Sequence, residues 1–135
     1  MLDPLLLAKI FPCLFFAACF IQSGLDKVFD RKGNLSWMEP HFTKSPFRGM
    51  VPFLLSLLTL LEVATGLTCL SGAVTLFLGG PPAVPIVAMT LACFTVWSLF
   101  AAQRIAKDYV GAAVLASYFA VALIGLALMS VKRAI

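Results

Sequence analysis

The apolar residues of this chain fall into four long runs that are separated by polar or turn-forming segments. The runs cover roughly residues 4–25, 51–73, 83–103 and 109–131. Each is close to the roughly 20 residues that an α-helix needs to cross the hydrocarbon core of a bilayer. A lipid-exposed backbone must satisfy its own amides, and these runs are too long and too uniformly apolar for barrel strands. The pattern therefore predicts four transmembrane helices.

Two of the three connectors are short. Gly79-Gly80-Pro81-Pro82 predicts a tight turn between the second and third runs, and residues 103–108 form a brief charged connector between the third and fourth. Short connections join antiparallel neighbours, so these helices should lie side by side.

The connector between the first two runs, residues 26–50, is longer. It combines many charged side chains with Trp37, Phe42 and Phe47, a mixture typical of a segment that lies in the headgroup layer. Its prolines prevent one long helix. Ser36 with Glu39 suggests a capping box at the start of a short surface helix.

Composition supports a membrane protein. The chain has 135 residues, of which 61% are hydrophobic, and its mean hydropathy is +1.02. A chain this short cannot bury so much apolar surface within itself, so lipid should cover the remainder. We predict a single all-α domain over residues 1–135: a transmembrane four-helix bundle with an interfacial connector between its first and second spans.

The net charge of +4 arises in the connectors and at the ends of the runs, not along one basic stripe. We therefore expect anionic lipid headgroups as partners and no nucleic acid. Basic residues are fewer on the terminal side, which has Lys9, Lys132 and Arg133. The positive-inside rule then places the first and third connectors in the cytoplasm, most simply at a bacterial inner membrane. Those connectors hold seven basic residues: Lys27, Arg31, Lys32, Lys44, Arg48, Arg104 and Lys107.

Glu62 is the most informative residue because it lies inside the second apolar run, among leucines. An acidic residue at the centre of a membrane helix costs about 3 kcal/mol on insertion scales, whereas each leucine contributes about −0.5 kcal/mol, so the segment still inserts. In one interpretation Glu62 handles a proton or binds a ligand. In the other it is protonated, or bonded to a neighbouring polar side chain, and only holds helices together.

Helical spacing from Glu62 defines a small or polar face that should look toward the other helices. Its members are Thr59, Thr65, Gly66, Cys69, Gly72 and Ala73. Glu62, Thr59 and Thr65, with Gln22 from the first run, make up the candidate intramembrane polar site. No residue is assigned a catalytic role.

The end of the first run is polar, and there Lys27 can reach headgroups or a carboxylate. A solvated helix end and a substrate site both fit this segment. The four cysteines form no CxxC pair and His41 is the sole histidine, so we predict no metal, no haem and no other cofactor.

Small residues also follow one stripe of the fourth run. The stripe is typical of a packing seam, which is either internal or directed toward a partner. Its members are Ala113, Ala116, Ser117 and Ala120.

Two short motifs resemble those of the DoxX family of four-helix membrane proteins. Ser23-Gly24-Leu25-Asp26-Lys27-Val28 is similar to that family's Gly-x-x-Lys feature, and Glu62-Val63-Ala64-Thr65-Gly66 to its Glu-x-x-x-Gly pattern. The resemblance covers nearly the whole chain and implies Gly24, Lys27, Glu62 and Gly66 as family-motif residues. It also implies kinship with subunits of thiosulfate–quinone oxidoreduction and of other membrane redox or detoxification assemblies.

Three functions follow from these features. The leading hypothesis is a non-catalytic accessory subunit that packs against other membrane proteins in a respiratory, redox or secretory assembly. The alternative is a component of a quinone-linked oxidoreductase in which Glu62 takes protons beside a lipid-accessible quinone. The third, which has less support, is a carrier for a small or lipidic solute that uses Glu62 and Lys27 in a cavity between helices.

Overall fold

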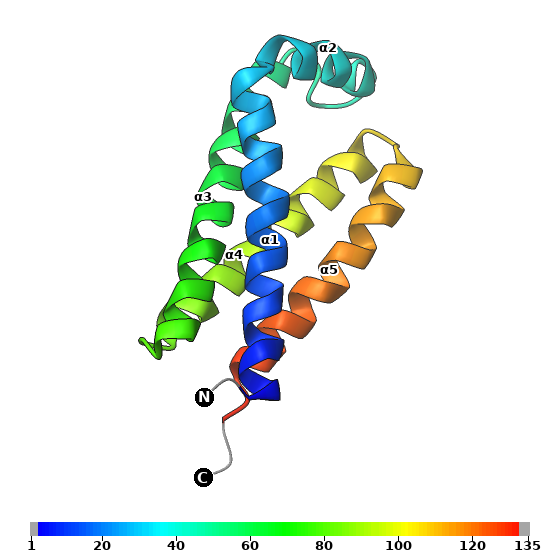
Figure 1. Cartoon of the computed structure of the whole chain (residues 1–135). Coiled ribbons are helices and arrows are strands. Elements are labelled where there is room, and N and C mark those ends of the chain that lie inside the picture. Colours follow the sequence, from blue (N-terminus) through cyan, green and yellow to red (C-terminus); the bar gives the residue numbers. More distant parts are fainter. Residues whose placement is uncertain (1–2, 133–135) are drawn as a thin grey trace.

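A computed structural model describes residues 3–132 and contains five α-helices in that range, with no strand (Figure 1). In chain order they are α1 (Pro4–Phe29), α2 (Arg31–Phe42), α3 (Val51–Leu78), α4 (Ala83–Ile105) and α5 (Tyr109–Met129). All except α2 are long and apolar enough to cross a membrane. The all-α fold with four spans and an intervening connector is therefore confirmed. Arg133 lies outside the described residues.

The helices differ from the predicted runs mainly at their ends. Helix α1 continues past residue 25 to Phe29, and α3 continues past residue 73 to Leu78. The runs follow apolar character, whereas a helix continues through polar residues until a cap ends it. For α3 that cap is Gly79, whose φ of 69° lies in the left-handed region that glycine adopts without strain. Helix α4 extends to Ile105 and α5 stops at Met129.

The connector after α1 contains helix α2, which begins earlier than the sequence suggested. Asp30 separates the two helices, and its carboxylate accepts a hydrogen bond from the backbone N–H of Gly33 at 3.2 Å. The capping box at Ser36 and Glu39 is therefore wrong, because Ser36 lies inside α2 and its hydroxyl donates to the Lys32 carbonyl at 3.0 Å. The N-cap of α2 is instead Asp30, which precedes Ser36 by more than one helical turn.

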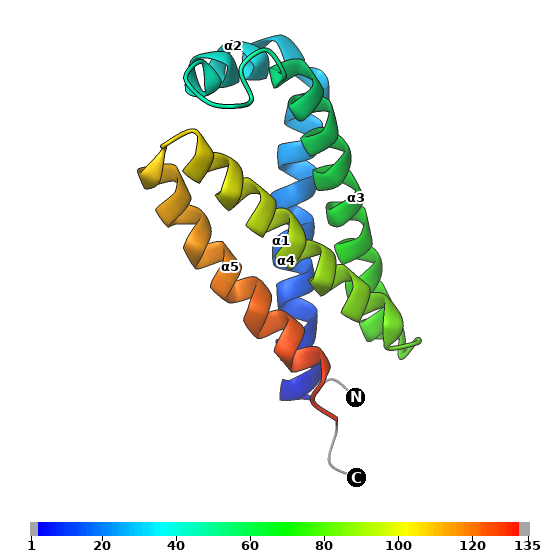
Figure 2. The same ribbon diagram turned by 180° about the vertical axis from the view of Figure 1, so that it is seen from behind.

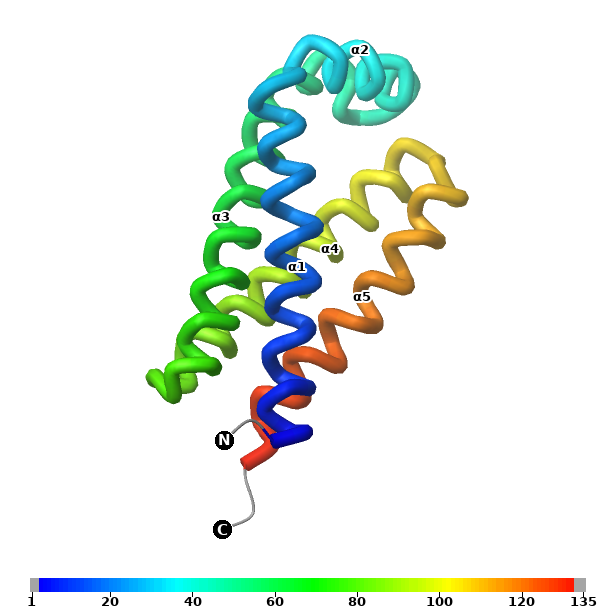
Figure 3. Tube along the Cα trace, in the orientation of Figure 1, coloured from blue at the N-terminus to red at the C-terminus, as the bar shows by residue number. Residues whose placement is uncertain are grey.

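The spanning helices form two pairs. Helix α1 lies along α3, and α4 lies along α5, while α4 also packs against α3 (Figures 1 and 2). The pairs converge where α1 begins and spread apart toward α2, which lies across that end of the bundle, as the trace in Figure 3 shows. The start of α1 and the end of α5 lie at the opposite end, where Lys9 Nζ donates to the Val131 carbonyl at 2.6 Å.

Close approach of α1 and α3 depends on two glycines. A Cβ added to Gly66 would lie 2.7 Å from the backbone nitrogen of Ile21, and one added to Gly24 would lie 2.6 Å from Cγ2 of Val63. Small residues let helix backbones approach in membranes, where packing rather than the hydrophobic effect holds helices together. The main core lies beside this crossing and includes the fully buried side chains of Phe16 and Met89.

Helix α2 covers the first turns of α3 through a second, smaller cluster. Met38 and Phe42 of α2 are buried there with Val51 and Leu55 of α3. Residues 43–50 return the chain to α3 with Gly49 at a φ of 82°. The connector is thus anchored to the bundle by its apolar side chains.

The outer surface of the four long helices is apolar. Phe11, Leu60 and Phe77 are each more than 60% exposed, and at most 33% of any spanning window is buried. Such a surface suits hydrocarbon and not water. The chain has the architecture of a multi-pass integral membrane protein.

Replacing Gly66 by alanine is expected to destabilise the fold by about 1–3 kcal/mol, because the new methyl group meets the backbone of α1. In an unobstructed helix the same change would instead stabilise by about 1 kcal/mol. Thermal unfolding in mild detergent, followed by circular dichroism, measures the difference. Gly125→Ala is the comparison, because the three atoms nearest to its added Cβ are side-chain atoms of Met89 and Pro12 and not backbone, and its effect should be smaller. Equal or reversed effects would contradict this account of the helix crossing.

Candidate functional site

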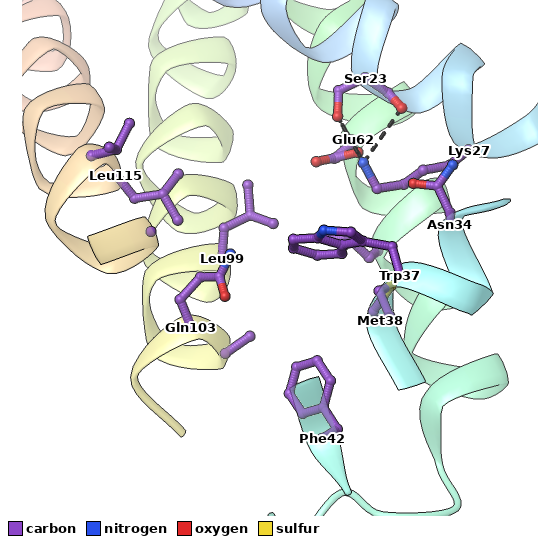
Figure 4. Close-up of a pocket in the computed structure, with 14 residues that line it drawn as sticks. Ser23, Lys27, Asn34, Trp37, Met38, Phe42, Glu62, Leu99, Gln103 and Leu115 are labelled. Carbon is purple, nitrogen blue, oxygen red and sulfur yellow. Dashed lines mark hydrogen bonds and ion pairs between the residues drawn. The ribbon is translucent and has the colours of Figure 1, made fainter. Parts of the chain in front are cut away.

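A buried ion pair joins α1 to α3. Lys27 Nζ lies 2.8 Å from Glu62 Oε2, and the Ser23 hydroxyl donates to the same oxygen at 3.0 Å (Figure 4). Lys27 also donates to Ser23 Oγ at 2.7 Å and approaches the Ser23 carbonyl at 3.5 Å. Three polar groups therefore satisfy one another within an otherwise apolar bundle.

Helix geometry explains how these groups meet. Ser23 and Lys27 are one turn apart, so both side chains lie on the same face of α1. Gly24 is buried between them against Val63, the residue that follows Glu62. The close contact at Gly24 brings the α1 backbone near enough for Lys27 to reach back along its own helix to the carboxylate.

The pair is deeply buried, since the Glu62 side chain is 2% exposed and that of Lys27 is 13% exposed. Removing a charge from water is expensive, and attraction between the partners recovers this cost only with good geometry and additional hydrogen bonds. Ser23 provides such bonds to both partners. The ion pair has no net charge, which lets the bundle keep it within an apolar region.

The second carboxylate oxygen of Glu62, Oε1, has no hydrogen-bond partner among residues 3–132. It points away from Lys27 toward the space between the two helix pairs (Figure 4). That space is a cavity of about 420 Å³. Its polar lining is Ser23, Lys27, Glu62, Asn34 and Gln103, and its apolar lining includes Trp37, Met38, Phe42, Leu99 and Leu115.

Two further cavities of about 310 Å³ each adjoin this one. One shares Ser23, Glu62, Leu99 and Leu115 with it and continues toward Cys19 and Tyr118. The other shares Met38, Phe42, Leu58 and Ala102 and is almost wholly apolar. The ion pair thus borders two of three neighbouring cavities that share lining residues.

The four residues of the predicted polar site do not form one cluster. Thr65 shares a hydrogen bond of 2.7 Å with Thr95 of α4, and Thr59 donates to the Leu55 carbonyl of its own helix at 2.6 Å. Gln22 is exposed and lines the smaller cavity near Tyr118. Glu62 instead meets Ser23 and Lys27. Sequence reasoning named Lys27 as able to reach a carboxylate but did not single out Ser23, whose signal was its one-turn spacing from Lys27.

The inward orientation expected for the face around Glu62 is confirmed for most of its members. Thr59 is only partly buried, because the spread of the helix pairs leaves that end of α3 more open than the end at Gly72. The buried members are Thr65, Gly66, Cys69, Gly72 and Ala73.

The aromatic residues of the connector occupy three different environments. Trp37 is 55% exposed, contacts the His41 ring in a tilted arrangement with ring centroids 4.2 Å apart, and extends into the cavity (Figure 4). Phe42 is buried, and Phe47 packs partly buried against it. Trp37 therefore belongs to the cavity mouth as well as to the outer surface of α2.

Other candidate residues lie outside the site. His41 Nδ1 is 2.8 Å from the Trp37 carbonyl, and Arg104 lies 4.6 Å above the Tyr109 ring. Among residues 3–132, no three His, Cys, Asp or Glu side chains gather as a metal site. The small-residue stripe of α5 faces outward, since Ala113, Ala116, Ser117 and Ala120 are all exposed.

Comparisons with protein-family models, with curated proteins and with solved structures found no match to this chain.

A double-mutant cycle tests the ion pair. Glu62→Gln and Lys27→Met should each lower stability by about 3–5 kcal/mol, since either change leaves a buried charge without its partner. The double variant should recover a large part of that loss, and thermal unfolding in detergent measures the coupling. Lys44→Met, at an exposed connector position, should change little. Strictly additive effects would show that the two side chains do not interact.

Proposed function

We propose that this chain is an accessory subunit of a larger membrane assembly and that it docks on a transmembrane helix of another protein through the outer face of α5. The supporting observation is the exposed stripe of Ala113, Ala116, Ser117 and Ala120. Nothing within residues 3–132 packs over these side chains.

Small residues on a lipid-facing stripe favour helix association. In hydrocarbon, helices associate through close van der Waals packing, and alanine and serine let two backbones approach. Helix α5 also has the smallest buried share of the four spans, at 22% of its most apolar window. Its outer face is therefore the part of the bundle best suited to a further helix.

The proposal also covers the family of this chain and the membrane in which it lies. The motif residues Gly24, Lys27, Glu62 and Gly66 all lie at the α1–α3 crossing or in its ion pair, which supports a DoxX-type subunit that uses them to hold its fold. The charged connectors support insertion into a bacterial inner membrane with α2 on the cytoplasmic side. On this proposal the chain carries no catalytic activity of its own.

Docking through α5 predicts that Ala116→Leu combined with Ala120→Leu removes a co-purifying membrane subunit. The larger side chains would separate the two helices while remaining compatible with lipid. The tagged chain should be expressed in its own host, purified in mild detergent and analysed by size-exclusion chromatography with mass spectrometry.

Ala64→Leu on the exposed face of α3 is the control and should keep the partner. A wild-type chain that purifies alone, or only as a homo-oligomer, would contradict the proposal. So would a partner that survives the α5 changes.

A second candidate function is a component of a quinone-linked oxidoreductase, and the cavity beside Glu62 favours it. The cavity volume of about 420 Å³ falls within the roughly 300–1,000 Å³ usual for small-molecule sites. Quinone reduction consumes two electrons and two protons. On this hypothesis the partner subunit delivers the electrons, and Glu62 relays protons to the ring.

For this second function, Glu62→Gln should abolish quinone reduction because glutamine cannot relay a proton. Since the same change lowers stability, turnover is compared only in variant assemblies that still purify with all their subunits. Thr59→Ala, which removes a hydroxyl bonded only within α3, is the matched control. Unchanged turnover in the glutamine variant would exclude the proton-relay role.

A further inference from the structure

We infer that the cavity beside the ion pair is a binding site for a neutral amphiphile whose hydroxyl head donates a hydrogen bond to Glu62 Oε1. This inference is independent of docking through α5, and it concerns an occupant of the cavity whether or not redox chemistry takes place there. Which head the site accepts depends on which hydrogen-bonding atoms of the ion pair and Ser23 are still free.

The ion pair leaves an acceptor available and no strong donor. Lys27 has three N–H donors, and all three face Glu62 Oε2, Ser23 Oγ or the Ser23 carbonyl. The Ser23 hydroxyl hydrogen is directed to Glu62. Glu62 Oε1 has no hydrogen-bond partner in the described chain, and it is accessible from the cavity, because none of the buried side-chain polar atoms among residues 3–132 is unsatisfied. A ligand that satisfies it must donate a hydrogen bond.

The charge of the site selects a neutral head. Lys27 and Glu62 cancel each other, so a bound carboxylate would lie against Glu62 without a free cation, and a bound ammonium would leave a net positive charge in the cavity. Either charged head would also lose its hydration on entering an apolar cavity. A hydroxyl group is uncharged, so it needs no counter-ion in the cavity, and it can donate directly to Oε1.

The apolar walls give the tail of such a ligand a route to the lipid. The cavity shares Met38, Phe42, Leu58 and Ala102 with the apolar groove between α3 and α4. That groove ends at Leu57 and Phe94, each of which is 53% exposed on the lipid-facing surface. On this inference the hydrocarbon chain passes these shared side chains beneath α2 and reaches the bilayer at Leu57 and Phe94.

Trp37 lines the head site on the side of α2. Its ring extends from α2 toward Leu99, between the ion pair and Phe42 (Figure 4). An aromatic ring with an N–H edge suits a boundary between an apolar tail and a polar head. The head and tail environments thus lie in the order that an amphiphile requires.

Photolabelling with matched probes tests the inference. The protein, reconstituted in vesicles of phosphatidylethanolamine and phosphatidylglycerol, is irradiated with a long-chain alcohol that carries a diazirine in its chain. The matched probes are its methyl ether, the carboxylic acid of equal length and a phosphatidylcholine with the same diazirine acyl chain. The alcohol should label the peptides of Leu58, Leu99 and Leu115 roughly tenfold more than the ether, because only the alcohol donates to a charged acceptor.

Two sets of variants separate the head site from the tail site. Leu115→Trp should fill the cavity without contacting Lys27 and abolish labelling, whereas Leu123→Trp on the exposed face of the same helix should not. The double variant Lys27→Met with Glu62→Leu removes both polar groups together and keeps the apolar volume. It should retain labelling by both probes and lose the preference for the alcohol.

Three outcomes would overturn the inference. Equal labelling by the alcohol and its methyl ether would show that no hydrogen bond to Glu62 selects the ligand. Equal labelling by the phosphatidylcholine probe would identify the cavity as a crevice filled by ordinary lipid chains. Preferential labelling by the carboxylic acid would identify an anion site. Each of these results can be obtained with the purified chain alone, without a partner subunit and without quinone turnover.

Discussion

A charged side chain within hydrocarbon requires a partner, and in this chain Glu62 and Lys27 fulfil that requirement for each other. Glu62 lies inside α3, whereas Lys27 lies near the end of α1, where a lysine would otherwise reach toward the headgroups. The 2.8 Å contact between them fixes how α1 lies along α3. The same contact requires glycine at positions 24 and 66, because a side chain at either position would keep the backbones of α1 and α3 apart. The ion pair and the glycine crossing therefore form one structural unit.

The second helix pair is less constrained at the end near α2. Helices α4 and α5 join α1 and α3 where Gly72 meets Pro85 and where Gly125 meets Pro12 and Met89. Thr65 and Thr95 add the buried hydrogen bond nearest to the open end. Beyond that point the pairs diverge (Figures 1 and 2). Helix α2 partly covers the gap with Met38 and Phe42, and the remaining space is the cavity that Glu62 Oε1 faces.

The sequence predicted the four spans well because hydrophobicity and length alone determine which segments suit a bilayer. It also predicted the inward face of α3 from helical spacing around Glu62, since that spacing is local. It did not predict which residues complete the polar site. Ser23 meets Glu62 only through the register of two helices that are far apart in sequence, and Thr65 turns to Thr95 because α4 lies on that side. Asp30 was also missed as an N-cap, because it follows α1 directly and no apolar run marks the start of α2.

Helix α5 carries both surfaces on which the proposals depend. Gly111 and Leu115 line the cavity on its inner side, while Ala113, Ala116 and Ser117 form the outer stripe. The two surfaces are separated by the width of one helix, about 10 Å. A helix packed against the stripe would border the segment that forms one wall of the cavity. Helix α5 is held to the rest of the bundle mainly by α4. The turn between α4 and α5 contains Lys107 at a φ of 61°, a conformation that is uncommon for a residue with a side chain. Any shift of α5 on docking would therefore change the width of the cavity and leave the ion pair between α1 and α3 intact.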